Sequence, residues 1–333
     1  MKRLFYLFVF LFLQQIASAQ QLPLYSQYLY NKFLINPAIA GADGFTSLNL
    51  TAREQWVGYS GAPRTYSVSW QTRILKRGYL LKQNLFNKTV YKPKTTGKIG
   101  FGGYIFSDKN GRVHRTGIQL AYSYHTWIRD YTQLSLGLAF TGYHFIIDLE
   151  SIDFEDPDEP WLNNELRRGM FVPDTDFGLY ILDPNFCFGF SAQQLFGASV
   201  KFGELGYKNY WMDRHYYVFG SYNFYTGVKT ELQPSLLFKV SEQVRPQVDI
   251  GFTYNYDNDF WAGIAYRTTG GAIIANIGFR YITSRVKMTS MYFGYSFDYT
   301  LNKIQSVTYG THELTLAIKF GDVDKRFNWL DRF

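Results

Sequence analysis

The stretch TQLSLGLAFTGYH, residues Thr132 to His144, alternates apolar side chains with small or polar ones. Four apolar residues share one face: Leu134, Leu136, Leu138 and Phe140. Small or polar residues share the other: Gln133, Ser135, Gly137, Ala139 and Thr141. Because successive side chains of a β-strand point to opposite faces, the pattern predicts a strand with one apolar face.

The same alternation recurs along the whole chain. It is clearest in Gln247–Tyr256 and Met291–Tyr299, where every second residue is apolar. Further runs are Thr65–Gln71, Ile118–His125, Leu232–Val240, His312–Phe320, Leu48–Arg53, Ile99–Ser107, Asp176–Leu182, Phe186–Gln193, His215–Tyr222, Phe260–Arg267 and Ala272–Tyr281. The sequence therefore predicts about fourteen strands, within the even-numbered range of bacterial barrels.

Turn-forming residues separate many of these runs, notably Asp108–Gly111, Tyr256–Asp259 and Thr268–Gly271. Such residues favour hairpins, so consecutive strands are expected to pair as an up-and-down meander. Three longer connections are predicted to be loops that carry specificity: Ile74–Lys98, Ile147–Thr175 and Gln194–Asp213.

The residues on the small or polar face of the strands distinguish between two all-β architectures, a soluble sandwich and a transmembrane barrel. A soluble sandwich should carry Lys, Glu and Thr on its outer face, whereas here that face is mostly Gly, Ser, Thr, Gln and Asn. Aromatic residues make up 20% of the chain, yet mean hydropathy is only −0.20. Both features favour a transmembrane antiparallel up-and-down β-barrel over residues 46–320.

The first residues read as a signal peptide. Lys2 and Arg3 precede an apolar run, and Ala17-Ser18-Ala19 supplies a cleavage site. Residues 1–19 should therefore be removed, and we expect the protein to be exported to the outer membrane. Residues 20–45 form a lead-in that either plugs the barrel or docks a partner, or simply leads to the first strand. Residues 321–333 form a C-terminal tail.

Patterns for catalysis and metal binding are weak. The best catalytic trio is His144 with Asp148 and Ser151, and the acidic loop Asp153–Glu159 lacks the spacing of a calcium loop. The lone Cys187 lies in an apolar strand and is expected to be inert. We expect no enzyme activity, metal or cofactor.

The charge pattern bears on partners. The formal net charge is +7, but the basic residues are scattered among carboxylates, so nucleic-acid binding is not expected. A mixed solvated surface is the default interpretation of these basic residues, and contact of some of them with outer-membrane lipid at the barrel rim is the alternative.

Several blocks carry a family resemblance. Residues 27–41 read QYLYNKFLINPAIAG, and further blocks are REQWVG (53–58), GAPRT (61–65), WAGIAYR (261–267), YSFDY (295–299), KI (303–304) and YGTHEL (309–314). Together they resemble the PorP/SprF family of the type IX secretion system of the Bacteroidota. The resemblance implies an outer-membrane barrel without catalytic activity. It also implies periplasmic and outer-membrane partners of the same machine, and cargo with a C-terminal sorting domain or a gliding adhesin.

Two groups of residues are candidates for function. The first is a partner-docking or structural signature: Gln27, Tyr28, Asn31, Asn36, Pro37, Gly41, Arg53, Gln55 and Trp56. The second is a charge network inside the barrel, where charges need partners: Arg267, Arg280, Asp298, His312 and Glu313.

Two other functions stay open at this point. One is a passive channel or small-molecule transporter of the same architecture, which conductance would reveal. The other is a barrel enzyme, which would need turnover that His144→Ala abolishes.

Overall fold

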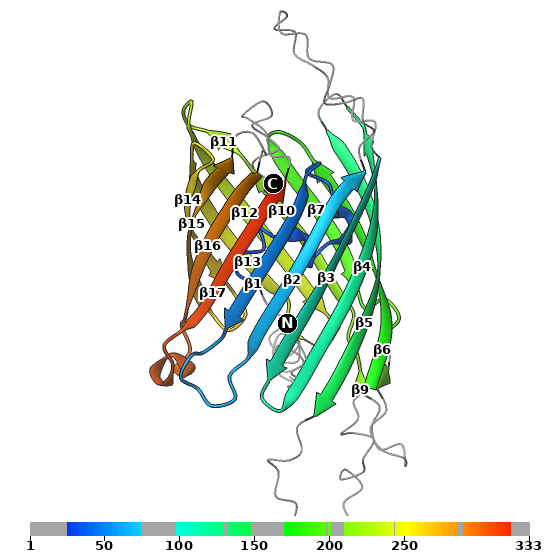
Figure 1. Cartoon of the computed structure of the whole chain (residues 1–333). Helices are drawn as coiled ribbons and strands as arrows, with labels where there is room; N and C mark the ends of the chain where they lie inside the picture. The colour runs from blue at the N-terminus through cyan, green and yellow to red at the C-terminus, as the bar shows by residue number, and fades with distance from the viewer. Residues whose placement is uncertain are drawn as a thin grey trace, which may run out of the picture.

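The computed structural model describes residues 25–74, 98–129, 132–147, 170–197, 199–200, 210–242, 244–284 and 289–320. They form a closed antiparallel β-barrel (Figure 1). The predicted signal peptide, the acidic loop and the C-terminal tail lie outside the described residues.

Fourteen strands make the wall, and each pairs with its neighbours in sequence. They are β1 (Thr46–Glu54), β2 (Arg64–Ile74), β3 (Ile99–Asn110), β4 (Val113–Trp127), β5 (Gln133–Ile147), β6 (Met170–Leu182), β7 (Phe186–Gln193), β10 (His215–Tyr222), β12 (Thr230–Ser241), β13 (Gln247–Tyr256), β14 (Phe260–Arg267), β15 (Ala272–Ser284), β16 (Thr289–Thr300) and β17 (Thr311–Phe320). Pairing of β1 with β17 closes the barrel. The short β11 (Phe224–Tyr225) adds to β12, and β8 (Ser199–Val200) pairs with β9 (Tyr210–Trp211).

The predicted strands are confirmed, in number and in order. One connection is shorter than expected: Ile147–Thr175 was expected to be a loop, but β6 already begins at Met170. The reason is that the alternation of β6 extends back through Pro173, a residue that weakens a sequence-based strand prediction because it lacks a backbone donor.

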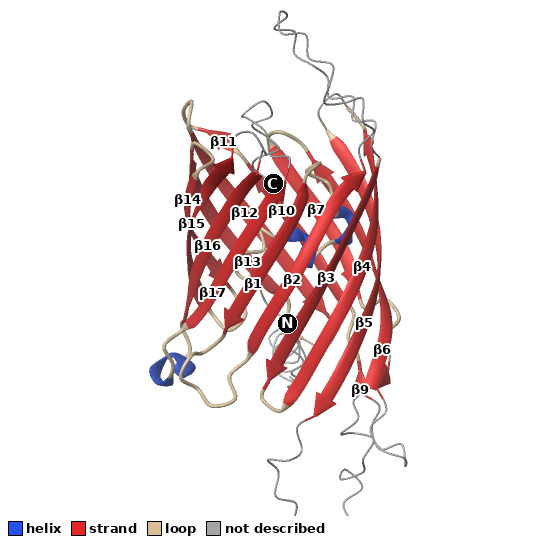
Figure 2. Ribbon diagram, viewed as in Figure 1, coloured by secondary structure: helices blue, strands red, loops and turns tan. Residues whose placement is uncertain are grey.

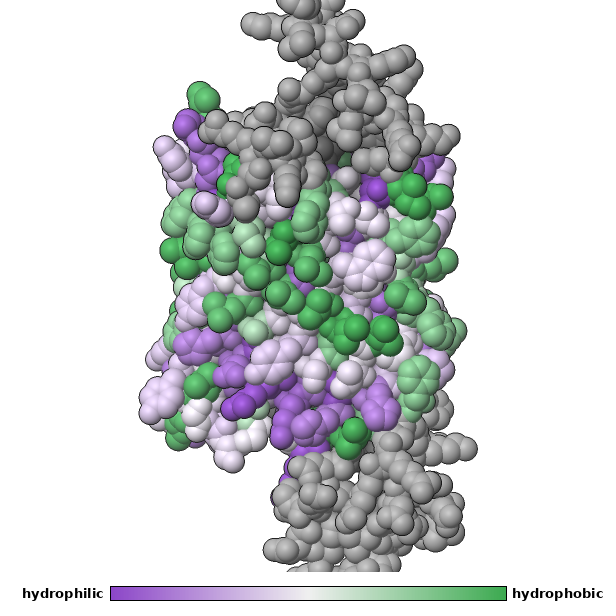
Figure 3. All heavy atoms as spheres, in the orientation of Figure 1, coloured by the Kyte–Doolittle hydropathy of each residue, from purple (hydrophilic) through white to green (hydrophobic). Residues whose placement is uncertain are grey.

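The two faces of the wall differ as the alternation requires. On β5, Leu138 and Phe140 are 59% and 57% exposed on the outside, whereas Ser135 and Thr141 are fully buried inside. Figure 3 shows apolar side chains across the middle of one side of the barrel, with hydrophilic ones nearer one end. An apolar band of this kind faces acyl chains in a transmembrane barrel. Among the described residues, no helix is long and apolar enough to cross a membrane.

The barrel has two mouths. The proximal mouth is where β1 begins and β17 ends, with Thr46 opposite Phe320. The distal mouth, drawn at the bottom of Figure 1, is where β1 ends and β17 begins. Connections 55–63, 111–112, 148–169, 194–214, 242–246, 268–271 and 301–310 join strands at the distal mouth.

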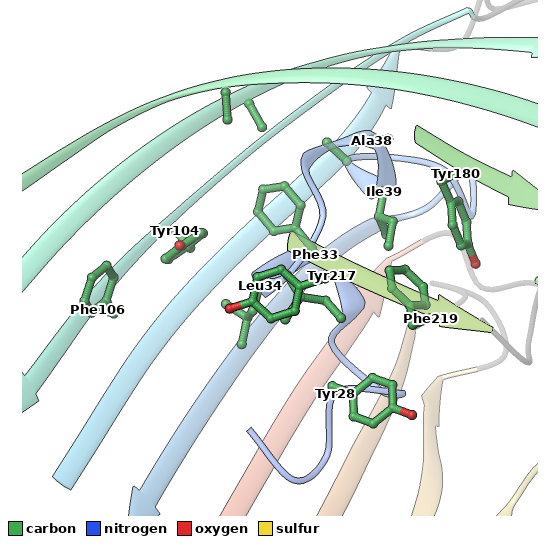
Figure 4. Packing of buried hydrophobic residues seen from close by; sticks show 14 of the residues in the cluster. Tyr28, Phe33, Leu34, Ala38, Ile39, Tyr104, Phe106, Tyr180, Tyr217 and Phe219 are labelled. Atoms are coloured by element: carbon green, nitrogen blue, oxygen red, sulfur yellow. The ribbon is translucent and has the colours of Figure 1, made fainter. Parts of the chain in front are cut away.

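The chain before β1 lies inside the barrel. Residues 25–43, which we call the lumen segment, contain the short 3-10 helices η1 (Lys32–Leu34) and η2 (Pro37–Ile39). Figure 2 shows both helices within the wall of strands. Side chains of the segment pack with inward-facing aromatic residues of the wall into one hydrophobic cluster (Figure 4). The core of this protein is therefore its lumen.

Candidate functional site

The lumen segment runs from one mouth towards the other. Near its start, Ser26 contacts Asp298 and Glu313, which lie close to the distal ends of β16 and β17. At its end, Asp43 forms an ion pair of 3.7 Å with Lys319, close to the proximal end of β17. The segment therefore spans most of the length of the barrel.

A buried charge cluster, which we call the distal anchor, holds the start of the segment. Arg53 of β1 pairs with Asp298 at 2.8 Å and with Glu313 at 2.9 Å. Arg267 of β14 pairs with Asp249 at 2.9 Å and with the same Asp298 at 3.3 Å. All of these side chains are at most 4% exposed, so each charge is stabilised by its partners and not by water.

The anchor binds the main chain of the segment as well as its side chains. The carboxylate of Glu313 accepts hydrogen bonds from the backbone N–H groups of Ser26 and Gln27, each at 2.8 Å. The Ser26 hydroxyl donates to Asp298 at 2.6 Å, and the Gln27 amide donates to the Glu313 carbonyl at 3.0 Å. Because Arg53 and Glu313 face each other across the β1–β17 pair, the segment is tied to the strands that close the barrel.

Glycines of the wall make room for the middle of the segment. A Cβ atom added at Gly137 would collide with the backbone of Pro37 and Ala38, and one at Gly178 would collide with the Asn36 side chain. Backbone atoms cannot move aside as a flexible side chain can. The small face that the alternation predicts is therefore where the segment approaches the wall most closely.

Asn36 fastens the segment to two strands at once. Its side-chain amide donates to the carbonyl groups of Leu179 and Phe190, at 2.9 and 3.1 Å. Its side-chain oxygen accepts from the N–H of Ala38 and so caps η2, which begins with Pro37. One residue thus shapes the segment and joins it to β6 and β7.

Wall side chains also recognise the carbonyl groups of the segment. The hydroxyl of Ser191 donates to the carbonyl of Ile35 at 2.5 Å. Ser123 and His125 both donate to the carbonyl of Ala40, at 2.5 and 3.0 Å. These polar contacts satisfy main-chain groups that would otherwise be buried without a partner.

Aromatic contacts fill the space around the segment. Phe33 is 1% exposed and meets Tyr104 of β3 edge to face, with ring centroids 6.1 Å apart. On the opposite side, Tyr30 stacks on Trp261 of β14 at 4.8 Å. A cavity of about 60 Å³ lies beside Tyr30 and Gln27, with room for a few water molecules.

The segment also carries a buried amine. Lys32 is 5% exposed, and burial lowers the pKa of its ammonium group below the ordinary value. The charged form of Lys32 is therefore less favoured in the lumen than in water.

The structure brings together part of the predicted lumen network. Arg267, Asp298 and Glu313 lie in the distal anchor. Arg280 does not, because it lies nearer the proximal mouth, where it pairs with Asp259 at 2.8 Å. His312 also does not: it points outward and contacts the Tyr295 hydroxyl at 2.7 Å, because it is one residue from the inward-facing Glu313.

The predicted signature residues fall into three places. The lumen segment holds Gln27, Tyr28, Asn31, Asn36, Pro37 and Gly41. Arg53 lies in the distal anchor, and Gln55 and Trp56 follow β1 at the distal mouth. Whether these residues serve a partner stays a prediction.

Other predicted residues are not brought together. His144 lies on the outward face of β5, while Asp148 and Ser151 lie outside the described residues. Cys187 is buried, and its sulfur lies 3.2 Å from the Ser221 hydroxyl. Among the described residues, no group of three or more His, Cys, Asp or Glu is arranged to hold a metal ion.

Sequence reasoning missed Asp249 and Ser26. Asp249 lies directly opposite Arg267 in the β13–β14 hairpin, so pairing the two predicted strands across the turn Tyr256–Asp259 could have revealed it. Ser26 had no such signal, since it contacts residues more than 240 positions away.

Comparisons with known proteins agree with this architecture. The family model of the type IX secretion system membrane protein PorP/SprF matches residues 17–318. No curated protein matches the chain.

Solved structures resemble the chain only distantly. The CymD monoaromatic hydrocarbon channel shares 11% identity at a TM-score of 0.48, covering 91% of this chain and 93% of its own. A Pseudomonas aeruginosa FadL homologue shares 12% identity at a TM-score of 0.45, covering 90% and 95%. The Acinetobacter baumannii outer membrane protein Omp33 shares 8% at 0.41, covering 84% and 99%. The family match spans nearly the whole described barrel, and the chain therefore belongs to the PorP/SprF family of type IX secretion system membrane proteins and is an outer-membrane β-barrel.

Proposed function

We propose that this protein is a non-catalytic, binding component of the type IX secretion system, whose own N-terminal segment fills its lumen. It binds other components of the machine, and secreted cargo or a surface adhesin, and it passes nothing through its barrel. The observation that carries this proposal is the burial of the lumen segment, in which Asn36, Ala38 and Ala40 have no exposed surface.

The contacts of the segment run round the circumference of the wall. Gln27 meets β17, Asn31 meets β2, Ala40 meets β4, Ile35 meets β7 and Tyr30 meets β14. A passive channel needs a continuous water-filled path, and these contacts occupy the place where that path would run. Binding is then left to the two mouths.

The connections support an orientation for the barrel. Of the five longest connections, 55–63, 148–169, 194–214 and 301–310 join strands at the distal mouth, and 75–98 joins strands at the proximal mouth. Outer-membrane barrels have longer loops outside the cell and shorter turns in the periplasm. We infer that the distal mouth faces the cell exterior, where retained cargo would be met.

Deletion of the gene tests the proposal. Sorting-domain cargo or a large adhesin should then stay unexported or be shed, while the membrane remains intact, and the intact gene supplied in trans should restore display. Normal cargo display in the deletion strain would refute the proposal.

Conductance separates this proposal from a channel. The purified full-length protein in planar bilayers should give no steady open-pore current, because the lumen segment stays in place. A steady current from well-folded protein would favour a small-molecule channel instead.

A further inference from the structure

We propose that two connections at the distal mouth, 55–63 and 301–310, form a rigid docking surface for a protein partner whose own contacting surface is apolar and uncharged. We call the pair the distal platform. The inference rests on the proposed binding function and names the surface that would perform it.

Backbone hydrogen bonds join the two connections, although about 250 residues separate them in sequence. The N–H of Val57 donates to the carbonyl of Gly310 at 2.9 Å, and the N–H of Tyr309 donates to the carbonyl of Val57 at 2.8 Å. The N–H of Trp56 donates to the Thr311 hydroxyl at 3.2 Å. Figure 1 shows the two connections beyond the ends of β1 and β17.

Neighbouring turns hold the platform in place. The N–H of Gly111, in the β3–β4 turn, donates to the carbonyl of Gly61 at 3.1 Å. The N–H of Leu301 donates to the carbonyl of Gly271, in the β14–β15 turn, at 2.7 Å. The 3-10 helix η4 (Lys303–Val307) is capped by the Asn302 side chain. A surface that is already ordered loses little conformational entropy on binding.

The backbone of the platform is strained at one residue that is not glycine. Trp56 has φ of 47°, a left-handed conformation that bulky side chains rarely adopt. Gly58, two residues on, has φ of 96°, and a Cβ there would press on the ring of Tyr309. Strain of this kind persists only where surrounding contacts enforce it, and it concentrates at functional sites.

The platform exposes apolar and aromatic side chains. Tyr309 is 77% exposed, Val307 60%, Leu301 53% and Tyr59 52%. Exposed tyrosines on a fixed backbone are typical of the residues that contribute most to protein–protein binding. Several exposed apolar side chains on two joined connections are typical of an interaction surface.

Charged residues show that the platform lies outside the hydrocarbon layer. Glu54 and Arg64, at the distal ends of β1 and β2, form an outward-facing pair at 3.9 Å, with side chains 42% and 60% exposed. Lys109 lies beside Arg64 on β3 and also points outward. Charges facing acyl chains are unfavourable, so the hydrocarbon ends before this level and the platform lies beyond it.

The charge of the platform defines its partner. Residues 55–63 contain no charged side chain, and residues 301–310 contain only Lys303. Charged surfaces attract charged partners and do so less at high salt. This surface should instead bind an apolar, uncharged protein surface, and its binding should resist salt.

A photo-crosslinking phenylalanine analogue tests the proposal in the full-length protein in its own membrane. It replaces Tyr59 or Tyr309 on the platform, and, as a matched control at the proximal mouth, Phe224, which is 51% exposed. Both platform positions should give an adduct with the same protein, one that also co-purifies with the unmodified chain. That adduct should persist in 0.5 M salt (on the order of a 5 Å screening length), and the Phe224 position should not give it.

A substitution then tests whether the exposed side chains carry the binding. Val307→Ser together with Tyr309→Ser should weaken crosslinking through Tyr59 at least tenfold, while the barrel keeps its heat-resistant compact form on electrophoresis. The proposal is overturned if this variant crosslinks as before, or if the adducts contain lipid only, a second copy of this chain, or a salt-sensitive partner. If deletion of the gene blocks export but the double variant does not, the platform fails and the proposed function stands.

Discussion

The start and the middle of the lumen segment are held by different means. At the distal anchor, Ser26 and Gln27 are bound by ionised groups that need one another inside the barrel. Twelve residues on, Ala38 is held by close packing against Gly137, a wall position without a side chain. The first arrangement fails when a charge is left alone, and the second fails when an atom is added.

Arg53→Met should give the largest loss of stability. It leaves the buried carboxylate of Glu313 without its cationic partner and leaves Asp298 with Arg267 alone, which should cost about 4 kcal/mol of unfolding free energy. Denaturant titration of the folded barrel in lipid vesicles measures it. Arg64→Met, at the exposed pair with Glu54, is the matched control and should cost less than about 1 kcal/mol. Equal costs would show that the anchor contributes no more than a surface pair.

Gly137→Leu should give the second-largest loss of stability. The new side chain meets the backbone of Ala38, so either the lumen segment or the wall must shift, at a cost of about 3 kcal/mol. Leu138→Phe enlarges the next residue on the outward face and should change little. If protease digests the segment no faster in Gly137→Leu than in the control, the close packing has been overestimated.

Asn36→Ala should have an intermediate effect. It removes the donor to the carbonyl groups of Leu179 and Phe190 and the cap of η2, and should cost about 2 kcal/mol. Hydrogen exchange at the N–H of Ala38 should quicken while exchange in β10 stays slow. Unchanged exchange at Ala38 would contradict the role of Asn36.

His312→Ala should give the smallest effect. This residue points away from the lumen and makes one side-chain hydrogen bond, with Tyr295, and a ring contact with Phe297, so the change should stay within about 0.5 kcal/mol. Thermal unfolding measures it, beside Arg53→Met as reference. A loss comparable to that of Arg53→Met would place His312 back in the charge network.

In the predicted charge network, the sequence could tell which side of the wall each residue faces, but not which residues meet. That Asp298 and Glu313 face inward follows from a period of two residues, and the same rule sends His312 outward. Which inward charges meet depends on how far along the barrel each strand is placed. Arg280 and Arg267 both face inward, yet only Arg267 lies at the level of Asp298.

The sequence by itself determined the strands, their order and the side of the wall that each residue faces, because strand geometry is local and repeats every two residues. Only the tertiary structure decided what fills the barrel. Glu313 and Asn36 recognise groups from 143 to 287 positions away, and no local pattern specifies which distant groups will be brought together when the β1–β17 pair closes around the lumen segment.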